Sequence, residues 1–251
     1  GLMFHKMIAS AVLSALPSLL AAQEVAVDRA QKEWTILVFL NADNNLESYG
    51  YDDVREMEKI GSTSDVNVVV QFDRISPSGT PRFLVEKNER PYNDRRRSFN
   101  STIIEDLPEQ DMGDKKVLED FLEWGTKNFP AKHYALVMWN HGSGWKKEDE
   151  VALVKGISFD DTSGNHITTL QFADVMTSFK ARTGRSMDIV AFDACLMAMA
   201  EVVDGLVGSV YYVLAAEEVV PGMGQPYDGF LNAFTGREKK SPRVYAQDWV
   251  R

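Results

Sequence analysis

The sequence holds a single cysteine, Cys195, among its 251 residues, and only four histidines. One cysteine cannot form an internal disulfide. The histidines (His5, His133, His141 and His166) are scattered, so none of the His/Cys spacings typical of a zinc site is present. We therefore predict no metal centre built on thiolate or imidazole ligands.

Positive charge is scarce as well. The chain has 27 Lys and Arg against 37 Asp and Glu, a formal net charge of −10. This balance argues against a nucleic acid or an anionic membrane as partner, and it is compatible with a basic substrate. No strand-like segment is followed by Gly-x-Gly-x-x-Gly or a Walker-type loop, which disfavours a nucleotide-binding α/β domain.

Long apolar runs are confined to the amino terminus, which has the layout of a secretory signal peptide. His5 and Lys6 precede the apolar run 7–20, and small residues follow at 21–22. We expect residues 1–22 to be the signal peptide, 23–32 a linker and 33–251 one domain of a secreted or periplasmic protein. No other segment could span a bilayer. An unpaired thiol in an exported chain is a candidate reactive group.

The segment around Cys195 predicts a strand that ends beside a thiol. Ile189–Phe192 is apolar, partly β-branched and of strand length, and it stops at Asp193. The apolar spacing over Leu196–Leu206 predicts a helix directly after the cysteine. Helix N–H groups would favour the nucleophilic thiolate. The alternative interpretation is a small buried hydrophobe, the more common role of a lone cysteine.

A second apolar strand, at about 133–139, ends just before His141 and a glycine-rich turn. The segment up to Cys195 has room for a crossover helix, predicted from Thr169 to about Arg182. The two strands would then be parallel, with their carboxyl ends at one edge of the sheet, where ligands bind in open α/β sheets. There a neutral imidazole could take a proton from the thiol.

The rest of the chain alternates strand and helix patterns, which favours a single α/β domain. Further buried strands are predicted at Trp34–Leu40, Val66–Phe72 and Val210–Ala216, and helices at about Leu46–Lys59 and Asp114–Asn128. Arg82–Glu86 is predicted to pair back as a hairpin, and a short strand is expected within 151–159.

Several separated motifs resemble one family of enzymes. A block ending in His-Gly and another ending in Asp-Ala-Cys resemble the cysteine peptidases of the caspase fold: caspases, legumains, gingipains and clostripain. The stretches 40–47, 140–145, 159–161 and 192–197 resemble the clostripain family in particular. The likeness runs from about Trp34 to about Asp228. It implies a caspase-like three-layer sandwich with a mostly parallel central sheet flanked by helices.

The resemblance also implies a Cys–His dyad that needs no carboxylate to orient the histidine. Cys195 would attack the scissile carbonyl and form an acyl-enzyme, while His141 would act first as general base and then as general acid. The backbone N–H groups of Gly142 and Cys195 are our candidates for the oxyanion hole. A caspase-like binding module without catalytic activity remains the alternative function.

Members of the clostripain family favour Arg or Lys immediately before the cut bond, which requires an acidic pocket. Asp193 is our first candidate for that carboxylate, because strand alternation places it on the same face as Cys195. A second carboxylate is expected from Glu217, Glu218 or Asp228, and the sequence does not choose among them.

Several family members cut themselves between the His and Cys segments. By position, Lys155 is the predicted site, with Lys146 and Lys147 as alternatives. The protein is accordingly expected as a monomer or a processed two-chain form. Relatives usually continue beyond the equivalent of Arg251, which leaves open whether the domain is truncated at its carboxyl end.

The expected partners are peptides or proteins with Arg or Lys at the cut site. No cofactor is expected to be required for the chemistry. Some family members depend on calcium, but the chain has no EF-hand spacing, so any bound calcium would have a structural or regulatory role.

Overall fold

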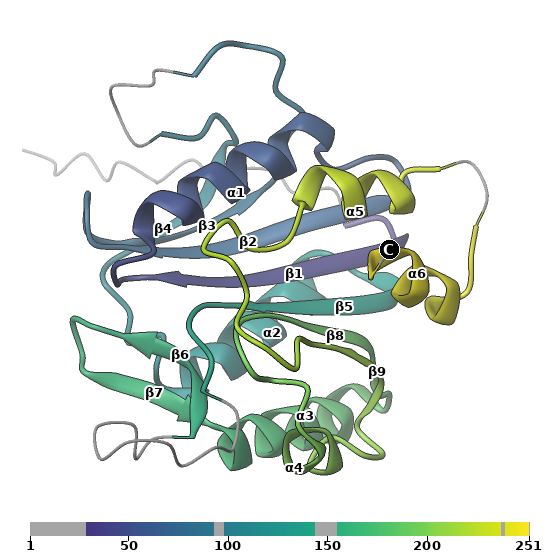
Figure 1. Ribbon diagram of the computed structural model, residues 1–251. Helices are drawn as coiled ribbons and strands as arrows, with labels where there is room; N and C mark the ends of the chain where they lie inside the picture. The colour runs from purple at the N-terminus through teal and green to yellow at the C-terminus, as the bar shows by residue number, and fades with distance from the viewer. Residues whose placement is uncertain (1–28, 93–97, 144–154, 237–238, 251) are drawn as a thin grey trace, which may run out of the picture.

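The computed structural model describes residues 29–92, 98–143, 155–236 and 239–250. The predicted signal peptide and part of the predicted linker lie outside these residues. A seven-stranded sheet forms the centre of the molecule, in the order β4-β3-β2-β1-β5-β8-β9 (Figure 1). Its strands are β1 (Lys32–Ala42), β2 (Val66–Arg74), β3 (Thr80–Leu84), β4 (Ile103–Leu107), β5 (Ala131–Trp139), β8 (Met187–Asp193) and β9 (Val210–Leu214).

Most of the sheet is parallel. Strands β2, β1, β5, β8 and β9 run in one direction, while β3 and β4 continue one edge in antiparallel pairing. The pairing of β2 with β3 confirms the predicted hairpin. A separate antiparallel pair, β6 (Gly156–Asp160) and β7 (Asn165–Thr168), lies near the carboxyl ends of the parallel strands (Figure 1).

Helices cover both faces of the sheet, as predicted for a three-layer sandwich (Figure 1). One face packs against α1 (Glu47–Ile60), α5 (Tyr227–Phe234) and α6 (Pro242–Trp249), the other against α2 (Lys115–Asn128), α3 (Thr169–Thr183) and α4 (Ala200–Asp204). Neighbouring residues of β1 alternate between these layers: Ile36 and Val38 face the first, Leu37 and Phe39 the second. Since both faces are covered, the central strands are continuously apolar.

The predicted crossover helix is α3. Thr168 and Gln171 form a capping box at its start, and Gly184 ends it with a left-handed φ of 71°. The chain then enters β8, which pairs in parallel with β5. The crossover therefore brings the strand before Cys195 beside the strand before His141. Among the described residues, no helix is both long enough and apolar enough to cross a membrane.

One predicted element is wrong. The helix expected directly after Cys195 begins only at Ala200, and the intervening residues form a turn. The N–H groups of Leu196 and Ala198 donate to the carbonyls of Glu218 and Ala216 at 3.2 and 3.0 Å. Because these N–H groups bond to the segment after β9, the residues directly after Cys195 do not form a helix, although their apolar spacing fits one. Helix α6 and strands β4 and β7 were not predicted.

Candidate active site

His141 and Cys195 lie side by side at the carboxyl edge of the sheet. The parallel register of β5 and β8 pairs Trp139 with Asp193, and the Asn140 N–H donates to the Asp193 carbonyl at 3.3 Å. His141 and Cys195 each follow their paired residue by two positions, so the register carries them forward together. Both line one cleft of about 250 Å³.

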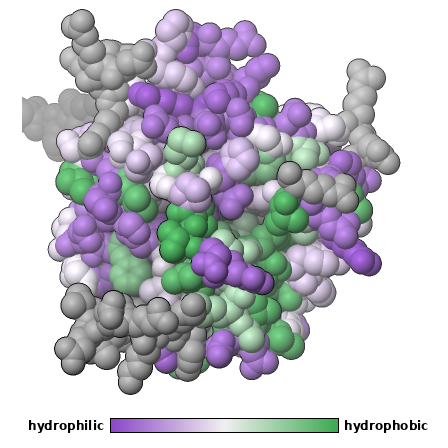
Figure 2. Space-filling model, viewed as in Figure 1, coloured by the Kyte–Doolittle hydropathy of each residue, from purple (hydrophilic) through white to green (hydrophobic). Residues whose placement is uncertain are grey.

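Part of the cleft wall comes from the segment between β9 and α5. Val219, Val220 and Pro221 contribute to it, and Val219 is 70% exposed. Figure 2 shows apolar surface in the middle of the face that this segment crosses in Figure 1. The cleft is open enough to admit a side chain, and its surroundings are largely apolar.

The imidazole of His141 is oriented by an amide. Its Nε2 lies 2.7 Å from Oδ1 of Asn45, in the turn after β1. With that oxygen as acceptor, Nε2 carries the proton and Nδ1 of the neutral ring is left as a base. Burial lowers the pKa of His141 below its usual value, and Asp161 opposes this shift. His141 is therefore held in the neutral form that a general base requires.

The other two described histidines, His133 and His166, make contacts typical of structural residues. His133 lies at the opposite end of β5, with Nδ1 3.0 Å from Oδ1 of Asp188, and its ring stacks on Trp34. His166 stacks on Phe159. Among the three described histidines, only His141 lines the cleft.

Cys195 is half-buried in a tight turn. The next residue, Leu196, has a φ of 60°, a left-handed conformation that is uncommon for a residue with a branched side chain. The Val220 N–H donates to Cys195 Sγ at 3.4 Å. The helix N-terminus expected beside the sulfur is not there, because α4 begins only at Ala200, and the turn places Cys195 in the lining of the cleft.

Gly142 touches the backbone that carries the thiol. A Cβ at this position would lie 2.5 Å from the Cys195 carbonyl oxygen and 2.9 Å from the Ala194 Cβ. Only a residue without a side chain permits this approach. Among the described residues, none accepts a hydrogen bond from the N–H of Gly142 or of Cys195. Both candidate oxyanion donors are therefore available.

Asp193 also lines the cleft and is 5% exposed. Its Oδ2 accepts hydrogen bonds from the Gln225 N–H at 3.1 Å and from the Tyr227 hydroxyl at 2.9 Å. Burial raises its pKa above the usual range. Gly224 covers it so closely that a Cβ there would lie 2.7 Å from Oδ2. The cleft thus contains a buried carboxyl group, with which a positively charged group could pair.

Asp53 is a second buried carboxyl near Asp193, and the sequence did not single it out. It lies in α1, and its Oδ2 accepts a hydrogen bond from Trp139 Nε1 at 2.6 Å. Burial, together with the nearby Asp193, raises the pKa of Asp53 to about 9. Only the packing of α1 against the sheet brings these two residues together, so no local pattern could have revealed the pair.

The other predicted pocket acids do not line the cleft. Glu217 and Glu218 are exposed in the turn after β9. Asp228, in the first turn of α5, pairs with Lys59 at 2.9 Å, and that hydrogen bond lowers its pKa. Of the predicted carboxylates, the structure brings only Asp193 to Cys195.

The predicted cleavage sites lie around a segment that the structure does not describe. Lys155 is the first described residue after 144–154 and is half-buried beside β6. Lys146 and Lys147 lie outside the described residues.

Comparison with known proteins gives a consistent set of relatives. A model of the clostripain family matches residues 38–250. Clostripain of Hathewaya histolytica is 31% identical over 217 residues, which cover 77% of this chain and 40% of that protein. The chain thus spans well under two thirds of that relative's length.

Two solved structures show the same fold. A secreted C11 cysteine protease from Bacteroides thetaiotaomicron, in complex with an irreversible peptide inhibitor, superposes with a TM-score of 0.68 at 23% identity, covering 87% of this chain and 57% of that one. An inactive zymogen C11 protease from Parabacteroides distasonis gives 0.61 at 21% identity, covering 79% and 52%.

Proposed function

The chain belongs to the clostripain family of cysteine peptidases, and we propose that it is a secreted endopeptidase that cuts after Arg or Lys by means of Cys195 and His141. The observation that carries this proposal is the shared cleft, in which the thiol, the imidazole and the buried Asp193 meet at one edge of the sheet. Its substrates would be peptides or proteins that can present a basic side chain to the cleft.

Acylation needs two proton transfers, one to His141 and one from it, and the exchange of a C–N bond for a C–S bond. His141 takes the proton of Cys195, and the sulfur attacks the scissile carbonyl carbon. The carbonyl oxygen becomes an oxyanion, to which the N–H groups of Gly142 and Cys195 can donate hydrogen bonds. The C–N bond then breaks as His141 passes its proton to the leaving amine. In deacylation His141 accepts a proton from the water that attacks the thioester. It returns this proton to the Cys195 sulfur as the C–S bond breaks and the new carboxyl end is released.

Asp193 supplies the charge for specificity. Burial raises its pKa, because an ionised carboxylate in the cleft is costly without a counter-charge. A guanidinium or ammonium group of the substrate supplies that counter-charge and favours the ionised form. An uncharged side chain offers no such compensation. Substrates with Arg or Lys are therefore preferred over those with Gln or Leu.

We further propose that the protein is made as a zymogen and cuts itself after Lys155, by the same dyad. The lysine follows β5 and precedes β6, so it lies close in sequence to the catalytic strands. A Cys195→Ala chain should stay intact on a denaturing gel while the wild-type chain yields two fragments. Two fragments from the pure Cys195→Ala protein would exclude self-processing.

A fluorogenic peptide assay tests the peptidase function. Matched substrates that differ only in Arg, Lys, Gln or Leu before the reporter are compared, with Cys195→Ala as the control. We expect turnover of the Arg and Lys substrates alone, abolished by an alkylating agent. Turnover that survives alkylation would contradict Cys195 as the nucleophile, and a processed chain that turns over none of the four substrates would favour the binding-module function.

A further inference from the structure

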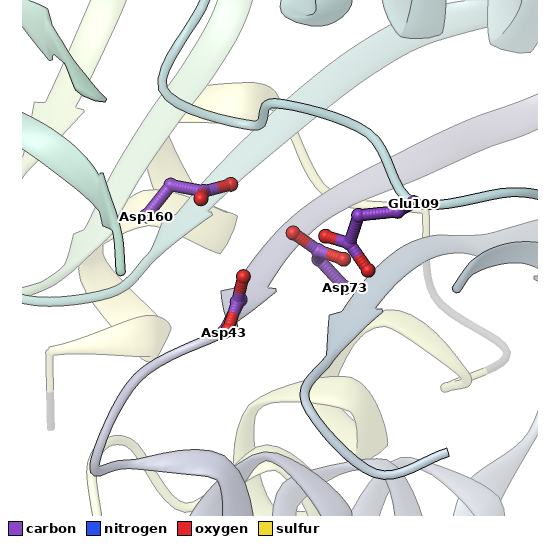
Figure 3. Close-up of side chains that lie close together, drawn as sticks. All are labelled: Asp43, Asp73, Glu109 and Asp160. Atoms are coloured by element: carbon purple, nitrogen blue, oxygen red, sulfur yellow. The ribbon is translucent and has the colours of Figure 1, made fainter. Parts of the chain in front are cut away.

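Four carboxylates converge at the carboxyl edge of the sheet, beyond the cleft. Asp43 follows β1, Asp73 lies in β2, Glu109 follows β4 and Asp160 ends β6. One oxygen of each lies within 4.8 Å of one oxygen of every other. Figure 3 shows the four side chains pointing into a common space. They come from four distant parts of the sequence, so only the folded sheet assembles them.

In three of these carboxylates one oxygen accepts a hydrogen bond from the chain and the other has no hydrogen-bond partner. Oδ1 of Asp73 accepts from the Thr80 hydroxyl at 2.9 Å, Oδ2 of Asp43 from the Thr162 N–H at 3.2 Å and Oε2 of Glu109 from the Ser78 hydroxyl at 2.6 Å. The opposite oxygens, Asp43 Oδ1, Asp73 Oδ2 and Glu109 Oε1, are buried and accept no hydrogen bond. Asp43 is 1% exposed and Asp73 is fully buried.

Such an arrangement is costly without a cation. Buried carboxylate oxygens need a donor or a counter-charge, and the buried oxygens of Asp43, Asp73 and Glu109 named above have no donor. A hard divalent cation satisfies both needs, because it accepts several oxygen ligands and neutralises their charge.

We propose that Asp43, Asp73, Glu109 and Asp160 form a calcium site. Calcium binds oxygen at about 2.3–2.6 Å, so ligands on opposite sides of the ion lie about 4.6–5.2 Å apart, which matches the observed spread. Magnesium binds at about 2.0–2.1 Å, keeps several waters and seldom takes four carboxylates. The set of ligands thus favours calcium in both size and charge.

The site is joined to the turn that holds His141. The side-chain amide of Asn140 donates to the carbonyls of Asn41 and Phe159, at 2.7 and 3.0 Å. These two carbonyls belong to the strand ends that carry Asp43 and Asp160. A cation that draws the two strand ends together therefore fixes the turn in which Asn45 meets His141. This coupling rests on the proposed catalytic role of His141, whereas binding of the ion does not.

The test measures binding without catalysis. The Cys195→Ala chain is stripped with EDTA and titrated with calcium by calorimetry, and its thermal midpoint is recorded in EDTA, calcium and magnesium. We expect one site per chain, a rise of about 5–10 °C at calcium concentrations a hundred times the Kd, and a smaller rise in magnesium. An unchanged midpoint in calcium, or an equal rise in magnesium, would overturn the proposal.

Matched variants locate the ion. Asp73→Asn and Glu109→Gln should each abolish the calcium-induced rise, while Asp73→Asn in EDTA should melt no lower than the parent because it relieves carboxylate repulsion. Asp106→Asn, which removes an exposed charge from the neighbouring strand β4, should keep the full rise. A full rise in both cluster variants would place the ion elsewhere and refute the site.

Discussion

At the scale of single residues, the proposed chemistry depends on the charge state of His141. Burial lowers its pKa, and the neutral Asn45 amide orients the ring without stabilising the charged form. A carboxylate at position 45 would give similar orientation but would favour the imidazolium. The neutral partner therefore keeps the base available at lower pH.

The first prediction follows from this difference. For the wild-type chain, the acid limb of kcat/KM should lie below pH 6.5, because activity falls only as His141 becomes protonated. Asn45→Asp should move that limb upward by about one pH unit or more, since a nearby negative charge raises the pKa of the imidazole. The measurement is a pH profile of kcat/KM with an Arg substrate.

Asn232→Asp is the matched control for the added charge, because Asn232 is exposed on α5. It should leave the profile unchanged. An Asn45→Asp profile that coincides with the wild type would show that Asn45 does not contact the working base.

A second residue-scale prediction concerns Asp53. Its pKa is raised to about 9 in the folded chain and is near 3.8 when unfolded, so between these values the folded state holds a proton that the unfolded state releases. This contribution to stability is complete below pH 3.8 and is lost as the pH rises toward 9. Asp53→Asn keeps an acceptor for Trp139 but has no proton to lose.

The variant should therefore gain stability over the wild type by about 1 kcal/mol per pH unit between pH 5 and pH 8. Urea unfolding at several pH values measures this difference. Asp52→Asn, the exposed neighbour, should follow the wild type in parallel. A constant difference between Asp53→Asn and the wild type across this range would contradict the buried neutral acid.

At the scale of elements, the site depends on how close to each other the two chain segments lie that follow the last paired residues of β5 and β8. Gly142 and Cys195 approach each other at these ends, where a Cβ would overlap the Cys195 carbonyl oxygen. The strands themselves are buried and held by their ladder, so the added atom must displace the turns instead. Those turns carry both of the proposed reacting groups.

Gly142→Ala should accordingly separate His141 from Cys195 while the sheet stays intact. We expect kcat/KM to fall by about a hundredfold, the loss expected for a displacement of about 1 Å between reacting groups, with the far-ultraviolet circular dichroism unchanged. Gly229→Ala in α5 is the control, since its new Cβ would make only ordinary contacts. Equal activity of both variants would refute the close approach as a requirement.

At the scale of the whole molecule, long-range order was predictable where the pattern was strong. Apolar strands and the capped helix at 169–182 predicted the parallel sheet and the crossover that brings His141 and Cys195 to one edge. Strand alternation also placed Asp193 beside the thiol. These features follow from periodicities of two and 3.6 residues, which are visible in the sequence itself.

The features that sequence did not reveal depend on contacts between distant segments. The segment directly after Cys195 forms a turn instead of the predicted helix, because its N–H groups donate to carbonyls of the segment after β9, which no local spacing encodes. Asp53 reaches Asp193 only through the packing of α1. Glu217 and Glu218 follow the neighbouring strand as expected, yet the turn directs them to solvent.

The central claim is that Cys195 and His141 act together in one cleft that accepts a basic side chain. The most direct measurement is the rate of covalent labelling by a peptidyl ketone probe with Arg at its reactive end, followed by intact-protein mass spectrometry. The account predicts one adduct per chain, located on Cys195, with labelling at least a hundredfold slower in His141→Ala and for a probe with Glu in place of Arg. Labelling at the same rate in His141→Ala, or of both probes alike, would contradict it.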